Sequence, residues 1–439
     1  MNRPAIFLYS LILYSFILNS CTQKGVTRSH SSFQAANPDT DSEFSDNGDN
    51  NFKENSEDNN DEFPAPIAEN SELEESLPLL NPNQPSQPST NNSIKANDPM
   101  LNNLWSLKAR SNNLVTSNAQ KAWQINTDCR NVVVGVMDSG ITLDHPDLKD
   151  NLWIDTKAQK SIHKHGRNFA NFNKIPEDED SFAHGTHIAG TIGARGNNNT
   201  GVVGICWQAQ IAALSVTDAI SDQAYNSAVA EGLHYAVNKN IKIINASFGQ
   251  SLPKNYKLPQ VYQDALKRFT DSGGILVVAA GNENKNNDFL NDVPSNYVNP
   301  DPSKDTVISV ANHNGLGKRA QSSHFGIKTV DLAAPGGTSD GSDLSTAANF
   351  FSNLNKTILS TVNTKARSHN GKLYGHLTGT SMSTPHVVGA AALYWSHFPE
   401  KTALEVKNAI LDTVYKLPEW QNITTSGGVL DIYELMQNN

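Results

Sequence analysis

The chain has 439 residues and a formal net charge of −10. That charge is concentrated in residues 22–97, which hold 14 Asp or Glu against 4 Lys or Arg, whereas residues 98–439 balance to −1. The nearly neutral C-terminal part gives no basis for nucleic-acid binding. Three cysteines in the whole chain exclude a disulfide-rich scaffold.

Residues 1–20 have the pattern of an export signal. Arg3 precedes an apolar run over residues 5–18, which is shorter than the roughly 20 residues of a membrane-spanning helix and suits a signal core. The run ends at Cys21 in Leu-Asn-Ser-Cys, which resembles a bacterial lipobox, whose cysteine is acylated. We therefore predict an exported protein with a lipoprotein-type signal peptide, anchored to a membrane through Cys21. The alternative is a secreted protein with an ordinary signal, in which Cys21 is incidental.

Residues 21–97 are predicted to be a disordered acidic linker. They are rich in Asn, Ser, Asp, Glu and Pro and contain few large apolar residues, so burial cannot offset the entropy of ordering them. The character of the sequence changes at Asp98. We expect the folded domain to cover residues 98–439.

Buried-strand and helix patterns alternate through this domain. Continuous apolar, β-branched runs are typical of strands buried on both faces. Strands, with the turns that end some of them, are predicted at residues 131–140, 166–170, 210–216, 241–249, 274–282, 306–311 and 329–333. Helices are predicted at residues 119–125, 223–239 and 261–271, and small-residue helices begin near residues 184 and 381. The predicted fold is α/β, with one doubly wound, mostly parallel sheet.

Polar residues stand at the ends of several predicted elements. Asp138 closes the first long strand, at the sheet edge where α/β proteins place their chemistry, although taken alone it is equally explained as a turn aspartate. His184 and His187 begin a helix, but no carboxylate has the spacing of a metal site. Ser381 begins another helix, whose N-terminus favours negative charge. A nucleophilic serine also needs a base, a group that orients the base and an oxyanion donor.

Taken together, these segments resemble the subtilisin-like serine proteases, peptidase family S8. The resemblance covers about Asp98 to Leu435, and the chain order Asp, His, Ser is also that of the family. The matching motifs are Asp138-Ser139-Gly140-Ile141, His145-Pro146-Asp147-Leu148, His184-Gly185-Thr186-His187-Ile188-Ala189-Gly190, Ala280-Gly281-Asn282, Gly379-Thr380-Ser381-Met382 and Pro385-His386-Val387.

The resemblance implies a serine endopeptidase that hydrolyses peptide bonds in proteins. Ser381 would be the nucleophile, His184 the general base and acid, and Asp138 the group that orients the imidazole. Asn282 and the Ser381 backbone N–H would stabilise the oxyanion. Two alternatives remain: a catalytically inactive subtilisin-like module that binds peptides or a surface partner, and a structural protein of the cell envelope. The presence of all four residues disfavours the inactive module, and a structural protein would have no cleft and would not react with a serine-directed probe.

The resemblance also implies where the substrate binds. Ser247-Phe248-Gly249 and Ala279-Ala280-Gly281 match the two segments that flank the P1 side chain, the residue on the acyl side of the cleaved bond. The pocket floor falls near Asp292, which would favour a basic P1 residue if it points inward. We expect protein or peptide substrates and a monomeric enzyme.

A structural calcium site is a further implication of the resemblance. Its hard oxygen ligands would be the side chains of Asp147 and Asn198 and the carbonyls of Gly196, Thr200 and Val202. Asp98 would add a ligand from the start of the domain. The alternative is a polar surface loop. No organic cofactor is expected.

Three features depart from the family pattern or add to it. Residues 22–97 show no helix or strand pattern that would build a folded inhibitory propeptide. A polar insert runs from Thr338 to Thr357 where family members have a few residues. Cys129 and Cys206 precede strands that are parallel neighbours in the family's sheet, so the resemblance predicts a disulfide, provided that their Cα atoms lie within about 7 Å.

Overall fold

The computed structural model describes residues 94–217, 221–253, 256–338, 357–365 and 371–438. The predicted signal peptide, Cys21, most of the predicted linker and residues 339–356 of the insert lie outside these ranges. No helix of the described residues is long and apolar enough to cross a membrane. Residues just before Asp98 also contact the domain: Ile94 exchanges two hydrogen bonds with the Gln124 side chain, and Ala96 is buried.

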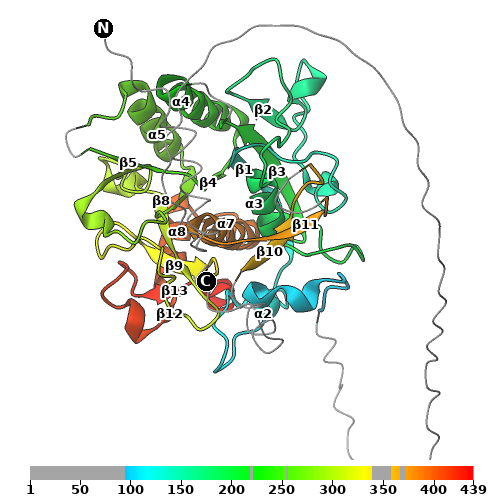
Figure 1. The fold of residues 1–439 in the computed structure, drawn as a ribbon, viewed down its shortest axis with the longest axis vertical. Helices are drawn as coiled ribbons and strands as arrows, with labels where there is room; N and C mark the ends of the chain where they lie inside the picture. Colours follow the sequence, from blue (N-terminus) through cyan, green and yellow to red (C-terminus); the bar gives the residue numbers. More distant parts are fainter. Residues whose placement is uncertain (1–93, 218–220, 254–255, 339–356, 366–370, 439) are drawn as a thin grey trace, which may run out of the picture. The chain divides into compact units, whose positions relative to one another are not determined.

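A nine-stranded sheet lies at the centre of the fold (Figure 1), in the order β12-β13-β9-β8-β6-β4-β1-β3-β2. All neighbouring strands pair in parallel except β12 and β13, which confirms the predicted fold class. Its strands are β1 (Asp128–Asp138), β2 (Gly166–Asn168), β3 (Gln208–Ser215), β4 (Ile243–Ala246), β6 (Ile275–Ala279), β8 (Val307–His313), β9 (Leu332–Pro335), β12 (Tyr415–Lys416) and β13 (Gly428–Val429). Two antiparallel pairs complete the strands: β5 (Gln250–Leu252) with β7 (Asn291–Val293), and β10 (Ile358–Thr361) with β11 (Tyr374–Leu377).

Helices cover both faces of the central sheet. The α-helices are α2 (Ala119–Ala122), α3 (His184–Gly193), α4 (Asp222–Lys239), α5 (Gln260–Asp271), α7 (Thr380–His397), α8 (Ala403–Asp412) and α9 (Ile432–Gln437). Short 3-10 helices are η1 (Leu101–Asn103), η2 (Trp105–Leu107), η3 (Lys149–Asn151), η4 (Ser161–His163), η5 (Asn287–Phe289), η6 (Pro302–Lys304) and η8 (Pro418–Trp420).

Successive side chains of each strand point to opposite faces, and both faces are apolar. On β1, Val134 and Val136 pack in the core that contains α3 and α7. Met137 packs in the other core, with residues of α4 and α5, two helices that lie side by side in Figure 1. Burial on both sides explains why the strands read as continuous apolar runs.

The sheet reverses its strand order at β1. β3 pairs with one edge of β1 and β4 with the other, so the chain runs outward in both directions from this strand. Ligands of open α/β sheets bind beyond the carboxyl ends of the strands at such a reversal. Asp138, the last residue of β1, therefore lies where the fold favours a site.

Helix α7 is buried at every residue from Thr380 to Ser396. Small residues allow this depth: a Cβ at Gly389 would lie 2.9 Å from Ile205 Cβ. The helix begins at Thr380 directly after Gly379, whose φ of 133° favours glycine. The start of α7, with Ser381, is thus fixed by packing along the whole helix.

A disulfide joins Cys129 in β1 to Cys206, just before β3, and their Cα atoms are 5.7 Å apart. The predicted disulfide is confirmed, because β1 and β3 are parallel neighbours. One predicted strand is displaced: β9 spans Leu332–Pro335 rather than 329–333. The reason is local, since the Val330 backbone N–H bonds back to the Gly326 carbonyl in a turn.

Candidate active site

Asp138 and His184 are joined by a hydrogen bond. The end of β1 supplies the carboxylate and the start of α3 supplies the ring, and His184 Nδ1 donates to Asp138 Oδ1 at 2.8 Å. The two elements come close because residue 185 is glycine: a Cβ there would lie 2.2 Å from the Gly140 carbonyl oxygen. The Gly185 N–H also donates to Ser139 Oγ. In the neutral ring, the bond to Asp138 places the proton on His184 Nδ1 and leaves Nε2 as an acceptor.

The surroundings of His184 are acidic. Burial of the ring opposes its charged form, but the charge and hydrogen bond of Asp138, together with the charges of Asp180 and Asp178, outweigh it and raise the pKa of His184 to about 9. Asp180 also accepts a hydrogen bond from the His184 backbone N–H. Burial raises the pKa of Asp178 to about 7. Because the pKa of His184 is raised to about 9, the charged imidazolium form is favoured at neutral pH.

Ser381 occupies the first turn of α7 and is tied to the residue that follows β4. In an α-helix its carbonyl would accept the N–H of residue 385, but that residue is Pro385, which has none. Ser247 Oγ donates to this carbonyl instead, at 2.9 Å, and itself accepts a bond from Asn245 Nδ2 at 2.9 Å. A buried side-chain network thus replaces one missing helix bond.

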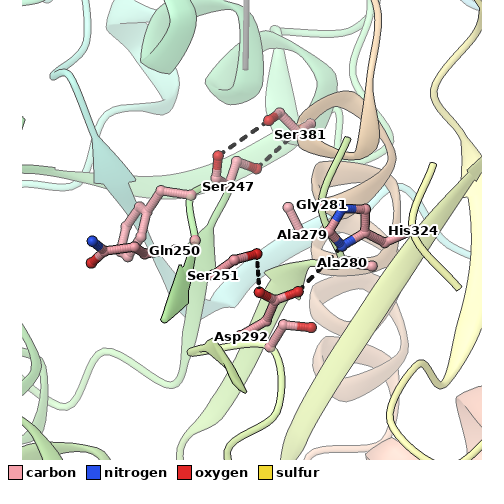
Figure 2. A pocket seen from close by; sticks show the side chains of 12 residues that line it. Ser247, Gln250, Ser251, Ala279, Ala280, Gly281, Asp292, His324 and Ser381 are labelled. Atoms are coloured by element: carbon pink, nitrogen blue, oxygen red, sulfur yellow. Dashed lines mark hydrogen bonds and ion pairs between the residues drawn. The ribbon is translucent and has the colours of Figure 1, made fainter. Parts of the chain in front are cut away.

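The hydroxyl of Ser381 points to Ser247 in this structure. Ser381 Oγ donates to the Ser247 carbonyl oxygen at 3.1 Å (Figure 2). Within the described residues, no hydrogen bond joins Ser381 Oγ to the His184 ring. The predicted triad requires two hydrogen bonds, Asp138 to His184 and His184 to Ser381. The structure contains the first of them. Catalytic hydrogen bonds are often long or absent before substrate binds.

Asn282 follows the turn after β6, next to the start of α7. Its Oδ1 accepts two hydrogen bonds from Thr380, from the backbone N–H at 2.9 Å and from the hydroxyl at 3.1 Å. Because a backbone N–H can only donate, these bonds identify the oxygen of the amide. Asn282 Nδ2 is then the side-chain atom left to donate to a bound group.

A pocket opens beside Ser381 (Figure 2). The six predicted substrate-contacting residues, Ser247, Phe248, Gly249, Ala279, Ala280 and Gly281, all line it. Asp292 lines it too and is 4% exposed, and its carboxylate faces Ser251 and His324, two other lining residues (Figure 2). Figure 2 shows Ser381 at one end of the lining and Asp292 at the other.

The loop predicted to bind calcium is held by two buried carboxylates. Asp147 Oδ1 accepts from Asn198 Nδ2 at 2.8 Å and Oδ2 from the Val202 backbone N–H at 2.9 Å. Asp98 accepts from the Asn197 N–H at 2.9 Å. Burial raises the pKa of Asp147 to about 6, against the hydrogen bonds that lower it. As the loop stands, the amide nitrogen of Asn198, not its oxygen, faces Asp147, because the oxygen accepts the Thr200 N–H.

Sequence reasoning missed the side chains that support the site from behind. Asn245 and the Ser247 hydroxyl hold the Ser381 carbonyl, and Pro385 was the available signal, because a proline inside a helix leaves a carbonyl without its partner. His324, which contacts Asp292, comes from a loop without a strand or helix pattern. No local signal identified it.

The sequence and the fold were compared with known proteins. The sequence model of the subtilase family matches residues 129–431. The thermostable alkaline protease of Halalkalibacterium halodurans is 32% identical over 280 residues, covering 64% of this chain and 61% of that protein. The major intracellular serine protease of Bacillus subtilis is 30% identical over 286 residues, covering 64% of this chain and 74% of that protein. The chain thus spans about 60% of the length of the first of these relatives.

Solved structures give the same picture of the fold. A protease from Pseudoalteromonas arctica superposes with a TM-score of 0.58 and 26% identity, over 78% of this chain and 98% of that one. Fervidolysin from Fervidobacterium pennivorans superposes with a TM-score of 0.59 and 24% identity, over 78% of this chain and 47% of that one.

Proposed function

Because this chain belongs to the subtilase family, we propose that it is a serine endopeptidase acting on proteins or peptides. The nucleophile is Ser381, the base His184, the orienting carboxylate Asp138 and the oxyanion donor Asn282. The observation that carries this assignment is the 2.8 Å hydrogen bond from His184 Nδ1 to Asp138. It holds the tautomer in which Nε2 accepts a proton, as a general base must.

The reaction begins when Ser381 Oγ leaves the Ser247 carbonyl and donates to His184 Nε2. The oxygen attacks the substrate carbonyl carbon as its proton moves to His184, and the Asp138 carboxylate stabilises the imidazolium. The negative oxygen of the tetrahedral intermediate accepts hydrogen bonds from Asn282 Nδ2 and the Ser381 N–H. His184 then gives its proton to the departing amine, and water repeats the sequence on the acyl-enzyme.

The alternative is an inactive subtilase module that binds peptides. The observation that favours it is the Ser381 hydroxyl, which bonds to Ser247 rather than to His184. In that case the hydroxyl would stay on the Ser247 carbonyl when a peptide is bound.

A fluorophosphonate probe separates the two functions, because it labels only an activated serine. We expect labelling of the full chain, none in Ser381→Ala and normal labelling in the control Ser383→Ala. Ser383 lies two positions on, with its hydroxyl bonded to the Ala334 carbonyl. A folded wild-type protein that takes no label would overturn the protease and support the peptide-binding module.

We also propose that the loop from Gly196 to Val202 binds calcium together with Asp147. Two buried carboxylates beside one loop, and the raised pKa of Asp147, fit a site where a cation would offset the cost of burial. Gly196, Thr200 and Val202 would contribute carbonyls, and Asn198 must turn its amide to present its oxygen. The bound ion would only stabilise the loop. A chelator should lower the Tm of the wild type but not of Asp147→Ala, and equal responses would contradict the site.

We propose further that the protein is exported and anchored through an acylated Cys21, and that it acts as a monomer. Export is supported by the Cys129–Cys206 disulfide, because such bonds persist mainly outside the cytosol. Intact-mass analysis of the mature protein should find a lipid-modified cysteine at its N-terminus. A Cys21→Ala variant should appear in the medium. A mature wild-type chain that starts elsewhere, without lipid, would contradict the anchor.

A further inference from the structure

We propose that the pocket beside Ser381 selects a cationic P1 side chain, lysine or arginine, through the carboxylate of Asp292. This inference rests on the proposed function, because it assigns the substrate class of the same site. Asp292 is the only acidic residue among those that line the pocket, and no lysine or arginine is among them. The remaining lining is small, apolar or neutral-polar, apart from His324, whose charge therefore decides the net charge of the pocket.

The carboxylate of Asp292 is fixed at the inner end of the pocket by the small sheet of β5 and β7. Ser251 in β5 and Asp292 in β7 are paired across this sheet, and Ser251 Oγ donates to Asp292 Oδ1. The other carboxylate oxygen, Oδ2, lies 3.2 Å from His324 Nδ1. Two partners do not exhaust the acceptor sites of a carboxylate, so Asp292 retains lone pairs for a ligand.

A chain of hydrogen bonds determines where His324 carries its proton. Asn287 Nδ2 donates to the Ala280 carbonyl at 2.9 Å and to Ser295 Oγ at 3.1 Å, so the opposite atom of this amide, Oδ1, faces His324 Nδ1 at 2.7 Å. His324 Nδ1 therefore meets two acceptors, Asn287 Oδ1 and the Asp292 carboxylate. It must carry a proton to satisfy them.

The second ring nitrogen of His324 indicates a neutral ring. Nε2 is buried and has no hydrogen-bond partner among the described residues. A proton there would create a buried, unpartnered N–H on a charged ring, whereas a bare Nε2 leaves only an unused acceptor. With a neutral His324 ring, the only charge in the pocket is that of the Asp292 carboxylate, and His324 Nδ1–H acts as a hydrogen-bond donor that orients it.

A lysine or arginine side chain supplies what this pocket lacks. Its aliphatic stem would lie between the Ser247–Gly249 and Ala279–Gly281 walls, and its charged end would donate to Asp292. An uncharged P1 side chain of equal length would leave the buried carboxylate without that partner. A hydrogen bond to a charged group is worth enough to change kcat/KM by on the order of 10- to 100-fold.

The test compares peptide substrates that differ only at P1, arginine against citrulline and lysine against norleucine. Citrulline matches arginine in length without its charge, and norleucine has the four-carbon chain of lysine without the terminal ammonium group. We expect the full chain to cleave the charged member of each pair 10- to 100-fold more efficiently, in kcat/KM. Asp292→Asn should bring both ratios close to one, and Asp292→Glu should keep a preference for the charged member. The control Asp264→Asn removes a charge from the exposed side of α5 and should leave the ratios unchanged.

Fluorophosphonate labelling of every variant distinguishes a failure of the P1 proposal from a failure of the proposed protease function. A variant that labels at Ser381 is folded and active, so its P1 ratios are interpretable. Should Asp292→Asn fail to label, the comparison of Asp292→Glu with the wild type carries the test. Equal cleavage of charged and neutral partners by a labelled wild type would overturn the cationic P1 pocket and leave the protease intact. A folded wild type that takes no label would instead overturn the proposed function.

Discussion

The network behind Ser381 can be tested with a double-mutant cycle between Ser247 and Pro385. Ser247→Ala removes the hydroxyl that donates to the Ser381 carbonyl and accepts from Asn245. Both partners are buried, and a buried polar group that loses its partner costs about 1–3 kcal/mol. Because two groups lose their partner, the substitution should lower the free energy of unfolding by about 2–6 kcal/mol.

Pro385→Ala should rescue part of this loss. An alanine restores the backbone N–H that α7 would direct to the Ser381 carbonyl, so only the Asn245 amide remains without a partner. The cost of Ser247→Ala should then be about 1–3 kcal/mol smaller in the Pro385→Ala background. That difference is the coupling energy between the Ser247 hydroxyl and the backbone donor that α7 lacks at Pro385.

The measurement is urea denaturation followed by tryptophan fluorescence. All variants should carry Ser381→Ala, which removes autolysis and keeps the backbone carbonyl. Ser215→Ala is a matched control, since its buried hydroxyl donates to the Ser139 carbonyl without involving α7, and its cost should be the same in both backgrounds. Equal costs of Ser247→Ala in the two backgrounds would refute the claim that Ser247 replaces the helix donor.

Three further predictions concern catalysis and stability. His184 must be neutral to accept a proton, and its pKa is raised to about 9, so kcat/KM should rise with pH along a limb well above 6.5; a limb at or below 6.5 would contradict the acidic surroundings. Asn282→Ala should lower kcat by roughly 10²–10³-fold with little change in KM for the same peptide, whereas a change mainly in KM would point to a role in binding substrate. Cys129→Ala with Cys206→Ala should cost about 4 kcal/mol in urea unfolding, because the disulfide closes a loop with a sequence separation of 77; an unchanged midpoint would show that the bond does not constrain the unfolded chain.

The sequence was sufficient to predict those strands and helices whose own residues carry a clear pattern. The β-branched run ending at Asp138 and the small-residue pattern after Ser381 predicted the strand, the helix and the ends at which the candidate site lies. A parallel strand that is buried on both faces has a continuous apolar run, which can be recognised from the sequence alone. The resemblance to the family, and not any single segment, predicted which strands are neighbours and hence the disulfide.

Residues whose roles depend on partners far along the chain could not be predicted. His324 reaches Asp292 and Asn287 across 32 and 37 positions, and Ser247 meets Ser381 across 134. No periodicity links such pairs, because their contacts follow from how the loops after β4, β6 and β8 converge. The orientation of the Asn198 amide was missed for a related reason: the residue type suits calcium, and only the Thr200 bond shows which atom faces Asp147.

The contacts of residues 94–97 matter to anyone who trims this protein for expression or crystallisation. A cut at residue 98, where the composition changes, would remove the Ile94 pairing with Gln124, the buried Ala96 and the Asn97 side chain that accepts the Asn199 N–H at 2.9 Å. It would also leave a charged amino terminus on Asp98, beside the loop that Asp98 holds. A chain cut a few residues before Ile94 would keep the contacts of residues 94–97. Comparing its stability with that of a chain cut at residue 98 would measure how much these residues stabilise the loop at residues 197–199.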